Sequence, residues 1–352
     1  MYRPDYYWGT GVQVREARWG WRRDIRFQVV NPDIDGLLTA CLLHQLKGWP
    51  IIGFYDTQRL LIDPAHPLPL TMPEVIWVDI DMCWPGARSL SQHVVLDSPA
   101  DASVVSAYAE TVNPSLLRGH ARRAHYREKY PFGTFQWAWW LIGPGALPAA
   151  PAVDDAVMTG LAWMPDGGFQ SVEGVWRENC VLWATQHMPG SILAPLAGTD
   201  PSLARAAVVA AERELRRLSG VDRGWRNHQF TLTHGSRTGP EFNVPLNEVP
   251  DTLQALCSAI TEIYGWRTVS LPRSYDAHEG AWLTGQEPPP GWPKSANHHE
   301  VASLAVTGGR QFCWTTPGDL RVVLPELSHA PSLGTDVNSA GTLGAQRPQP
   351  QD

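Results

Sequence analysis

The chain is predicted to fold as an α/β protein in which a mostly parallel sheet is flanked by helices. Short apolar runs typical of buried strands alternate with segments of helical pattern. Two of these runs end in carboxylates, within residues 25–35 and 75–81. Crossover helices between parallel strands bring such ends to one edge of a sheet, where α/β proteins bind ligands. A smaller α/β domain is expected to follow in the C-terminal part.

The first elements follow from the alternation of these patterns. We expect a strand at 25–30, a helix at 37–47, and strands at 50–54, 75–78 and 94–96. The segment at 135–142 is too apolar for a surface and is predicted to be a buried helix, while residues 204–218 form a helix with a charged outer face. The domains are expected to be an N-terminal arm at 1–24, a main domain at 25–220, a smaller α/β domain at 221–326 and a disordered tail at 327–352.

Composition narrows the classes of protein. The chain has 352 residues, 43% of them hydrophobic and 18% charged, as expected of a globular protein. A net charge of −7 argues against a protein that binds nucleic acid electrostatically over its whole surface. No apolar run is long enough to span a membrane, and the five scattered cysteines form no metal or disulfide motif. We therefore expect a cytoplasmic protein; the oligomeric state stays open.

Carboxylates gather at the ends of the first and third expected strands. The first strand leads into Asn31-Pro32-Asp33-Ile34-Asp35-Gly36, the third delivers Asp79, and His93 follows closely. Ionised carboxylates repel one another unless a cation lies between them, and hard divalent ions prefer oxygen ligands. The alternative is that Asp33 and Asp35 only cap the following helix. Recurrence of Asp-x-Asp after the third strand favours the metal site.

These residues resemble the first three motifs of the DHH phosphoesterases. The resemblance extends to Asn113-Pro114, to Tyr130–Thr134, and to a stretch from Asp154 to Gly167 that is similar to the Asp-bearing fourth motif. It covers about residues 25–170, under half of the chain. Two departures stand out: Asn31 occupies the place of a His, and Ser91-Gln92-His93 replaces Asp-His-His.

The resemblance implies a metal-dependent phosphodiesterase, a hydrolase with exonuclease-like activity. Its substrates would be single-stranded nucleic acid ends, short oligonucleotides or cyclic dinucleotides, cleaved by metal-activated water with Mn²⁺ or Mg²⁺, two ions in all. Asp79 and His93 would be catalytic. The implied metal ligands are Asn31, Asp33, Asp35, Asp79, His93 and Asp166. Because two histidines of the family pattern are missing, a catalytically inactive nucleotide- or protein-binding module stays open as the alternative.

A basic segment at 118–129 follows Asn113-Pro114. Arginine matches phosphate oxygens with two parallel hydrogen bonds, so this segment is expected to bind the substrate phosphates. The alternative is an ordinary solvated helix face. The predicted substrate-binding residues are Asn113, Arg118, Arg122 and Arg123.

Overall fold

The structure is a computed structural model, which describes fourteen segments of the chain. These are residues 24–55, 59–66, 73–83, 87–93, 111–120, 125, 127–143, 155–236, 239–242, 244–279, 281–284, 311–316, 319–323 and 328–334.

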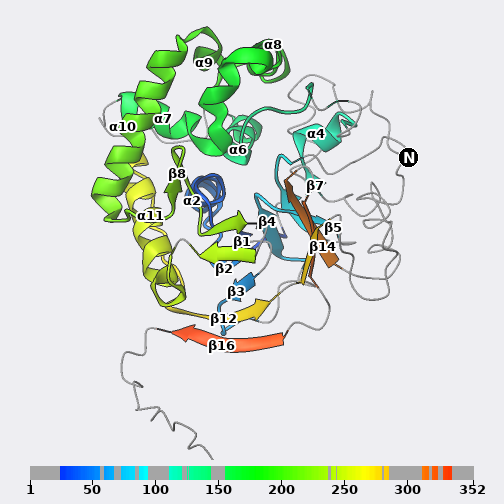
Figure 1. The fold of residues 1–352 in the computed structure, drawn as a ribbon, viewed down its shortest axis with the longest axis vertical. Helices are drawn as coiled ribbons and strands as arrows, with labels where there is room; N and C mark the ends of the chain where they lie inside the picture. Colours follow the sequence, from blue (N-terminus) through cyan, green and yellow to red (C-terminus); the bar gives the residue numbers. More distant parts are fainter. Residues whose placement is uncertain are drawn as a thin grey trace, which may run out of the picture.

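An eight-stranded sheet forms the centre of the molecule, in the order β16-β12-β3-β2-β1-β4-β6-β7 (Figure 1). Its parallel part consists of β2 (Ile51–Tyr55), β1 (Phe27–Val30), β4 (Val75–Val78), β6 (Arg88–Leu90) and β7 (Thr111–Val112). From β1 the chain crosses to β2 on one side, while β4 lies on the other side of β1. The strand order thus reverses beside β1, which is where open α/β sheets form ligand sites.

Three strands extend the β2 edge of this sheet in antiparallel fashion: β3 (Arg59–Ile62), β12 (Ser274–Glu279) and β16 (Ser328–Gly334). A separate four-stranded sheet joins β5 (Asp81–Cys83) to β14 (Gln311–Thr316), β15 (Asp319–Val323) and β13 (Ala281–Thr284). Two small hairpins, β8 (Trp225–Arg226) with β9 (Gln229–Phe230) and β10 (Thr233–Ser236) with β11 (Gly239–Phe242), complete the described strands.

The described helices are led by α2 (Ile34–Lys47), which follows β1 directly. The others are α4 (Pro114–Leu117), α6 (Thr134–Ile142), α7 (Asp155–Trp163), α8 (Arg177–Leu182), α9 (Ala194–Gly198), α10 (Pro201–Ser219) and α11 (Val249–Tyr264). Short 3₁₀ turns lie at η5 (Pro165–Val172), η6 (Gly174–Trp176) and η8 (Leu246–Glu248), and a π-helical turn at η7 (Trp183–His187). In Figure 1, α10 and α11 lie side by side along one flank of the sheet.

Both faces of the parallel strands are buried, which explains their unbroken apolar sequences. Successive residues alternate between two cores: Val30 and Val78 belong to the core shared with the helices, whereas Val29 and Trp77 belong to a second core on the opposite face. The predicted buried helix at 135–142 is α6, with Phe135 and Trp137 fully buried. The mostly parallel sheet with flanking helices agrees with the predicted fold class.

The predicted division into domains has no sharp counterpart in the described residues. α11 packs against α2 and α10, and β12 extends the central sheet, although both fall within 221–326. Residues 1–23, and 335–352 of the predicted tail, lie outside the described residues, as does the strand expected at 94–96. The boundaries at 24, 220 and 326 therefore stay predictions. The strand that leads to His93 is β6, which lies upstream of it.

Candidate functional site

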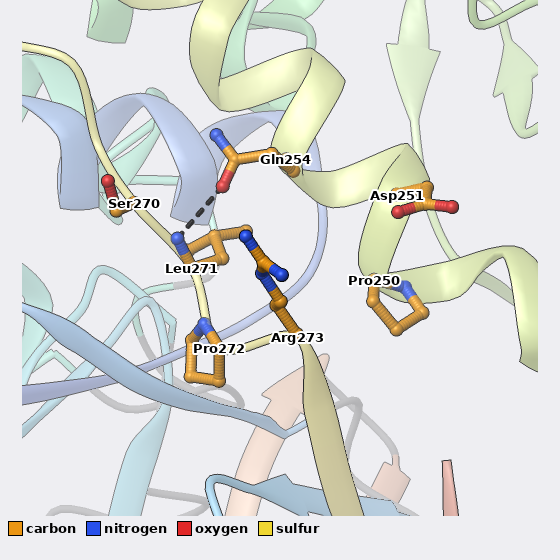
Figure 2. A pocket seen from close by; sticks show the side chains of 7 residues that line it. All are labelled: Pro250, Asp251, Gln254, Ser270, Leu271, Pro272 and Arg273. Atoms are coloured by element: carbon orange, nitrogen blue, oxygen red, sulfur yellow. Dashed lines mark hydrogen bonds between the residues drawn. The ribbon is translucent and has the colours of Figure 1, made fainter. Parts of the chain in front are cut away.

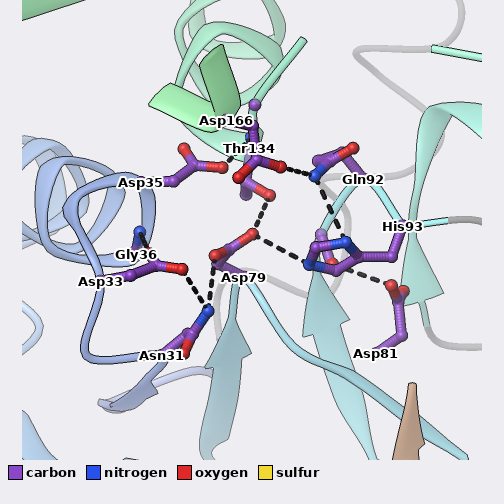
Figure 3. Close-up of polar contacts among 12 residues, drawn as sticks. Asn31, Asp33, Asp35, Gly36, Asp79, Asp81, Gln92, His93, Thr134 and Asp166 are labelled. Carbon is purple, nitrogen blue, oxygen red and sulfur yellow. Dashed lines mark hydrogen bonds and ion pairs between the residues drawn. The ribbon is translucent and has the colours of Figure 1, made fainter. Parts of the chain in front are cut away.

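Most of the predicted metal-site residues meet at the carboxyl ends of the parallel strands (Figure 3). Asn31 and Asp33 follow β1, Asp79 follows β4, and His93 lies just beyond β6. Asp166 comes from η5, which is far along the chain. We call Asp33, Asp35, Asp79 and Asp166 the acidic cluster. Asp35 and Asp79 are fully buried, whereas Asp33 is half-buried and Asp166 is exposed, so solvent reaches the cluster from the Asp33 and Asp166 side.

The turn after β1 positions Asp33. Its Oδ1 accepts a hydrogen bond of 2.9 Å from the Gly36 backbone N–H, which caps α2. Its Oδ2 accepts one of 2.7 Å from Asn31 Nδ2, and the same nitrogen lies 3.0 Å from Asp79 Oδ2. A Cβ at position 36 would lie 2.1 Å from the Asn31 carbonyl oxygen, so only glycine fits there. Asp33 therefore does cap α2, and its second oxygen still faces the cluster, so its predicted role as a metal ligand stays a prediction.

Asp35 joins α2 to the start of α6. Its two oxygens accept hydrogen bonds from the backbone N–H groups of Thr134, at 2.6 Å, and Phe135, at 2.8 Å. These groups have no partner within α6, and the positive end of the helix dipole favours a carboxylate. A Cβ at Gly133 would lie 2.7 Å from Asp35 Oδ2, so the close approach requires glycine. Asp35 thus has both oxygens engaged by the protein.

Asp79 lies at the centre of the cluster. Its backbone has φ of 59°, a left-handed conformation that is uncommon outside glycine and that turns the side chain at the end of β4. Oδ1 accepts a hydrogen bond of 2.6 Å from the Thr134 hydroxyl and lies 3.5 Å from His93 Nε2. Asp166 also has a left-handed backbone, with φ of 50°, and accepts a hydrogen bond from Gln92 Nε2.

A fully buried carboxyl group supports the loop after β6. Asp81 accepts hydrogen bonds from the Ser91 hydroxyl, at 2.8 Å, and from Asn113 Nδ2, at 3.0 Å. The Asn113 nitrogen also donates to the His93 carbonyl oxygen at 2.6 Å, while its oxygen caps α4. Asn113 therefore fixes the position of His93. The Asn113 side chain is buried, and its amide is occupied by these bonds. Its predicted contact with substrate stays a prediction.

The electrostatics of the site reflect crowding of negative charge. Burial, followed by repulsion from Asp79, raises the pKa of Asp33 and of Asp35 well above the usual range. Burial also raises the pKa of Asp81 to about 6. For His93, burial alone would lower the pKa, but Asp79, Asp166 and Asp81 outweigh it and raise the pKa to about 9. The acidic cluster thus favours a positive charge at its centre.

The donor types suit a hard or borderline divalent ion, because carboxylate oxygens and one imidazole converge. His93 Nε2 is buried and lies 3.5 Å from Asp79 Oδ1, so the imidazole faces the carboxylates of the cluster. The side chains as they lie do not form a coordination shell: within the described segments, no three His, Cys, Asp or Glu groups are arranged to hold an ion. The amides of Asn31 and Gln92 instead donate N–H groups to the carboxylates.

The predicted substrate arginines are only partly described. Arg118 ends α4 and is half-buried, with its guanidinium 3.2 Å from His187 Nδ1 and 5.5 Å from the Trp183 ring centre. Arg122 and Arg123 lie outside the described residues.

Four residues of the site were not predicted as site residues: Asp81, Gln92, Lys129 and Thr134. Asp81 is the second carboxylate of Asp79-Ile80-Asp81, so the repeated Asp-x-Asp could have indicated it. Burial lowers the pKa of Lys129, and the nearby Asp166 carboxylate raises it by a smaller amount, so Lys129 lies close to the cluster. Thr134 lies in the Tyr130–Thr134 stretch of the resemblance, but its role was not predicted, because that role depends on α6 pointing its first turn at Asp79.

A cavity of about 500 Å³ lies apart from the acidic cluster, at the start of α11 (Figure 2). Gln254 shapes it by accepting a hydrogen bond of 2.9 Å from the Leu271 N–H. Its lining residues are Pro250, Asp251, Gln254, Ser270, Leu271, Pro272 and Arg273. None of the predicted site residues lines this cavity.

Comparison of the chain with protein-family models, with curated proteins and with solved structures finds no match in any of the three. The resemblance to the DHH phosphoesterases therefore stays a prediction. No described helix has both the length and the apolar character needed to cross a membrane.

Proposed function

We propose that this chain is a metal-dependent phosphodiesterase of the DHH type. The observation that carries the proposal is the convergence of Asp33, Asp79, Asp166 and His93 at the carboxyl ends of parallel strands, at the point where the strand order reverses. The raised pKa values of Asp33 and Asp35 support it, since crowded carboxylates gain most from a bound cation. The substrates proposed are single-stranded nucleic acid ends, short oligonucleotides or cyclic dinucleotides.

Mn²⁺ or Mg²⁺ ions bound at Asp33, Asp79, Asp166 and His93 would polarise the phosphoester and activate the attacking water. Asn31 and Gln92 can turn their amides to present an oxygen in place of the N–H. The Thr134 hydroxyl holds one oxygen of Asp79 and so fixes its orientation. Asp35 is the least suited of the proposed ligands, because turning it to an ion would leave two N–H groups of α6 without partners.

The His93 imidazole can either carry a proton or bind a metal ion without changing its position. Its Nε2 faces Asp79, and in the absence of a cation the ring carries a proton because the surrounding carboxylates raise its pKa. Asn113 holds the backbone of His93, so the ring keeps its position when that proton is exchanged for a cation. The imidazole would hold a proton without the ion and would be one of its ligands when the ion is bound.

The non-catalytic alternative has an observation in its favour. Asn31 and Gln92 place N–H donors against Asp33, Asp79 and Asp166 where the family pattern has imidazoles. Amide donors satisfy carboxylates without a metal, so a site of this kind can persist as a module that binds a nucleotide or a protein.

The deciding experiment measures metal binding and hydrolysis on the same samples. The full chain is titrated with Mn²⁺ by calorimetry and incubated with end-labelled single-stranded DNA, short RNA and a cyclic dinucleotide. Asp79→Asn is the test variant, because Asn tolerates the left-handed backbone and removes only the charge. Asp222→Asn, at an exposed position, is the matched control.

Hydrolysis that requires Mn²⁺ and falls by about 100-fold or more in Asp79→Asn is the expected result. Metal binding without hydrolysis of any substrate would favour the binding module. A wild-type chain that binds no Mn²⁺ would overturn the phosphodiesterase proposal.

A further inference from the structure

A second group of titratable side chains lies where α4 ends and where the π-helical turn η7 follows α8. It comprises Arg118, His120, His125 and His187, which we call the basic cluster. The His120 and His125 rings stack with centres 5.3 Å apart, and the Arg118 guanidinium lies 3.2 Å from His187 Nδ1. Trp183 touches three of the four, through its ring edge toward His120, its contact with His187 and its face beneath Arg118.

The backbone holds these side chains firmly. The His120 N–H donates to the Ser115 carbonyl at 2.9 Å, and Trp183 Nε1 donates to the Glu128 carbonyl at 3.1 Å. Trp183 and His187 begin and end a single π-helical turn, an irregularity that is frequent at functional sites. The cluster is therefore a built arrangement rather than a set of loose surface side chains.

Two properties of the basic cluster point to an anion. Only 7% of the His120 surface is exposed, and its buried Nδ1 atom has no hydrogen-bond partner in the described part of the chain. Burial and the neighbouring Arg118 lower the pKa of His120 to about 3 and of His187 to about 4, so both rings are neutral at neutral pH. Neutral imidazoles each keep one N–H donor, and Arg118 adds a permanent charge with a planar set of N–H groups.

A metal ion fits the same cluster less well. The Arg118 charge repels a cation, and no three of the described His, Cys, Asp or Glu groups are placed to hold one. An oxyanion, by contrast, would accept from both the guanidinium and the imidazoles.

We propose that Arg118, His120, His125 and His187 form a binding site for a phosphate group. As the site for the phosphate of a nucleotide substrate it rests on the proposed function, whereas binding of phosphate itself does not require catalysis. Residues 128–134 connect the two sites. At one end, the Glu128 carbonyl accepts a hydrogen bond from Trp183, which contacts the basic cluster; at the other, the Thr134 hydroxyl donates to Asp79.

The test titrates inorganic phosphate and adenosine monophosphate into the full chain, with heat and histidine ring resonances as readouts. Arg118→Gln is expected to weaken phosphate binding about tenfold or more, as for loss of a charge-assisted hydrogen bond. His187→Gln is expected to weaken it about threefold. Arg118→Lys keeps the charge without the planar fork and is expected to fall between wild type and Arg118→Gln.

Arg217→Gln is the matched control, because this arginine is exposed on α10 and pairs there with a carboxylate, that of Glu214. It should leave phosphate affinity unchanged. The Asp79→Asn variant should bind phosphate like the wild type, and that result separates this site from the acidic cluster even if no substrate is ever hydrolysed.

The proposal is overturned if the wild type shows no saturable binding at about 10 mM phosphate. It is overturned equally if Arg118→Gln binds like the wild type while its melting curve shows it folded, or if Asp79→Asn alone abolishes binding, since the phosphate would then lie at the carboxylates.

Discussion

The acidic and basic clusters each crowd like charges together, yet the protein stabilises them by opposite means. In the acidic cluster, N–H and O–H donors meet the carboxylates: Asn31, Gln92, Thr134 and the start of α6 all donate to them, and His93 takes up a proton. In the basic cluster, burial and the neighbouring Arg118 instead lower the pKa values of His120 and His187, so that both rings are neutral beside a charged guanidinium.

The two clusters also differ in how far their polar atoms have hydrogen-bond partners. A carboxylate that gives up its charge by protonation still accepts hydrogen bonds, so the acidic cluster survives without a cation while still favouring one. An imidazole that loses its proton keeps one donor and one acceptor, and the buried Nδ1 of His120 has used neither role. The acidic cluster is therefore stabilised largely by its own donors and by the His93–Asp79 pair, whereas the basic cluster encloses the Nδ1 atom of His120 without a hydrogen-bond partner among the described residues.

The largest effect is expected from breaking the support of the acidic cluster. Gly133→Ala places a Cβ 2.7 Å from both Asp35 Oδ2 and Pro165 Cβ. We expect α6 to shift from Asp35, at a cost of about 2–4 kcal/mol in the free energy of unfolding. Urea unfolding measures this. In Gly198→Ala, where nothing lies within 4 Å of the new Cβ, the change should stay near zero. Equal stability of the two variants would contradict the role of Asp35.

Acid pH should lower the free energy of unfolding through the two neutral histidines of the basic cluster. The folded-state pKa values of about 3 for His120 and about 4 for His187 lie below the usual value near 6.5. The unfolded chain therefore binds more protons below pH 6.5, and the stability these neutral rings provide is lost as pH falls from 6.5 toward 4. Each ring contributes at most about 1.4 kcal/mol per pH unit.

Urea unfolding at pH 7, 6 and 5 checks this dependence. His187→Gln, which cannot be protonated, should show a flatter loss of stability than the wild type, whereas His66→Gln, outside the cluster, should follow the wild type. Parallel curves for wild type and His187→Gln would refute the assignment.

Restoring imidazoles should sharpen the preference of the acidic cluster for metal. The double variant Asn31→His with Gln92→His replaces two N–H donors by possible ligands, and we expect Mn²⁺ to bind about tenfold more tightly. Calorimetry measures the affinity, and Asn247→His, at an exposed position, is the control. If the double variant binds Mn²⁺ no better than the wild type, the two amides do not stand in ligand positions.

The smallest effect separates stability from phosphate binding. Trp183→Phe loses the hydrogen bond to the Glu128 carbonyl and part of the ring face under Arg118, and should cost about 1–2 kcal/mol. Trp225→Phe is the comparison variant, because Trp225 also donates to a backbone carbonyl, that of Val221, and lies under an arginine, Arg216, although it is only half-buried. Both variants should lose stability in urea unfolding, Trp225→Phe the less, but only Trp183→Phe should weaken phosphate binding.

The sequence was enough to predict the parallel strands and the carboxylates at their ends. Strands buried on both faces leave unbroken apolar runs such as Val75–Val78, and the turn residues that follow them carry the chemistry, so Asp33 and Asp79 could be assigned from local pattern alone. His93 and Asp166 were assigned as ligands only through the resemblance to the DHH phosphoesterases, and the structure brings both to the acidic cluster. The buried helix α6 was equally clear, because its apolar residues cover every side of the helix.

Only the tertiary structure decided the partners. Asp35 binds Thr134 and Phe135 across about a hundred residues of sequence, and His187 meets Arg118 across sixty-nine. Such contacts depend on how helices pack around the sheet, and no local pattern records them. The amide donors show the limit most clearly: Asn31 and Gln92 looked like missing ligands in the sequence, and the folded chain uses them to hold the carboxylates together.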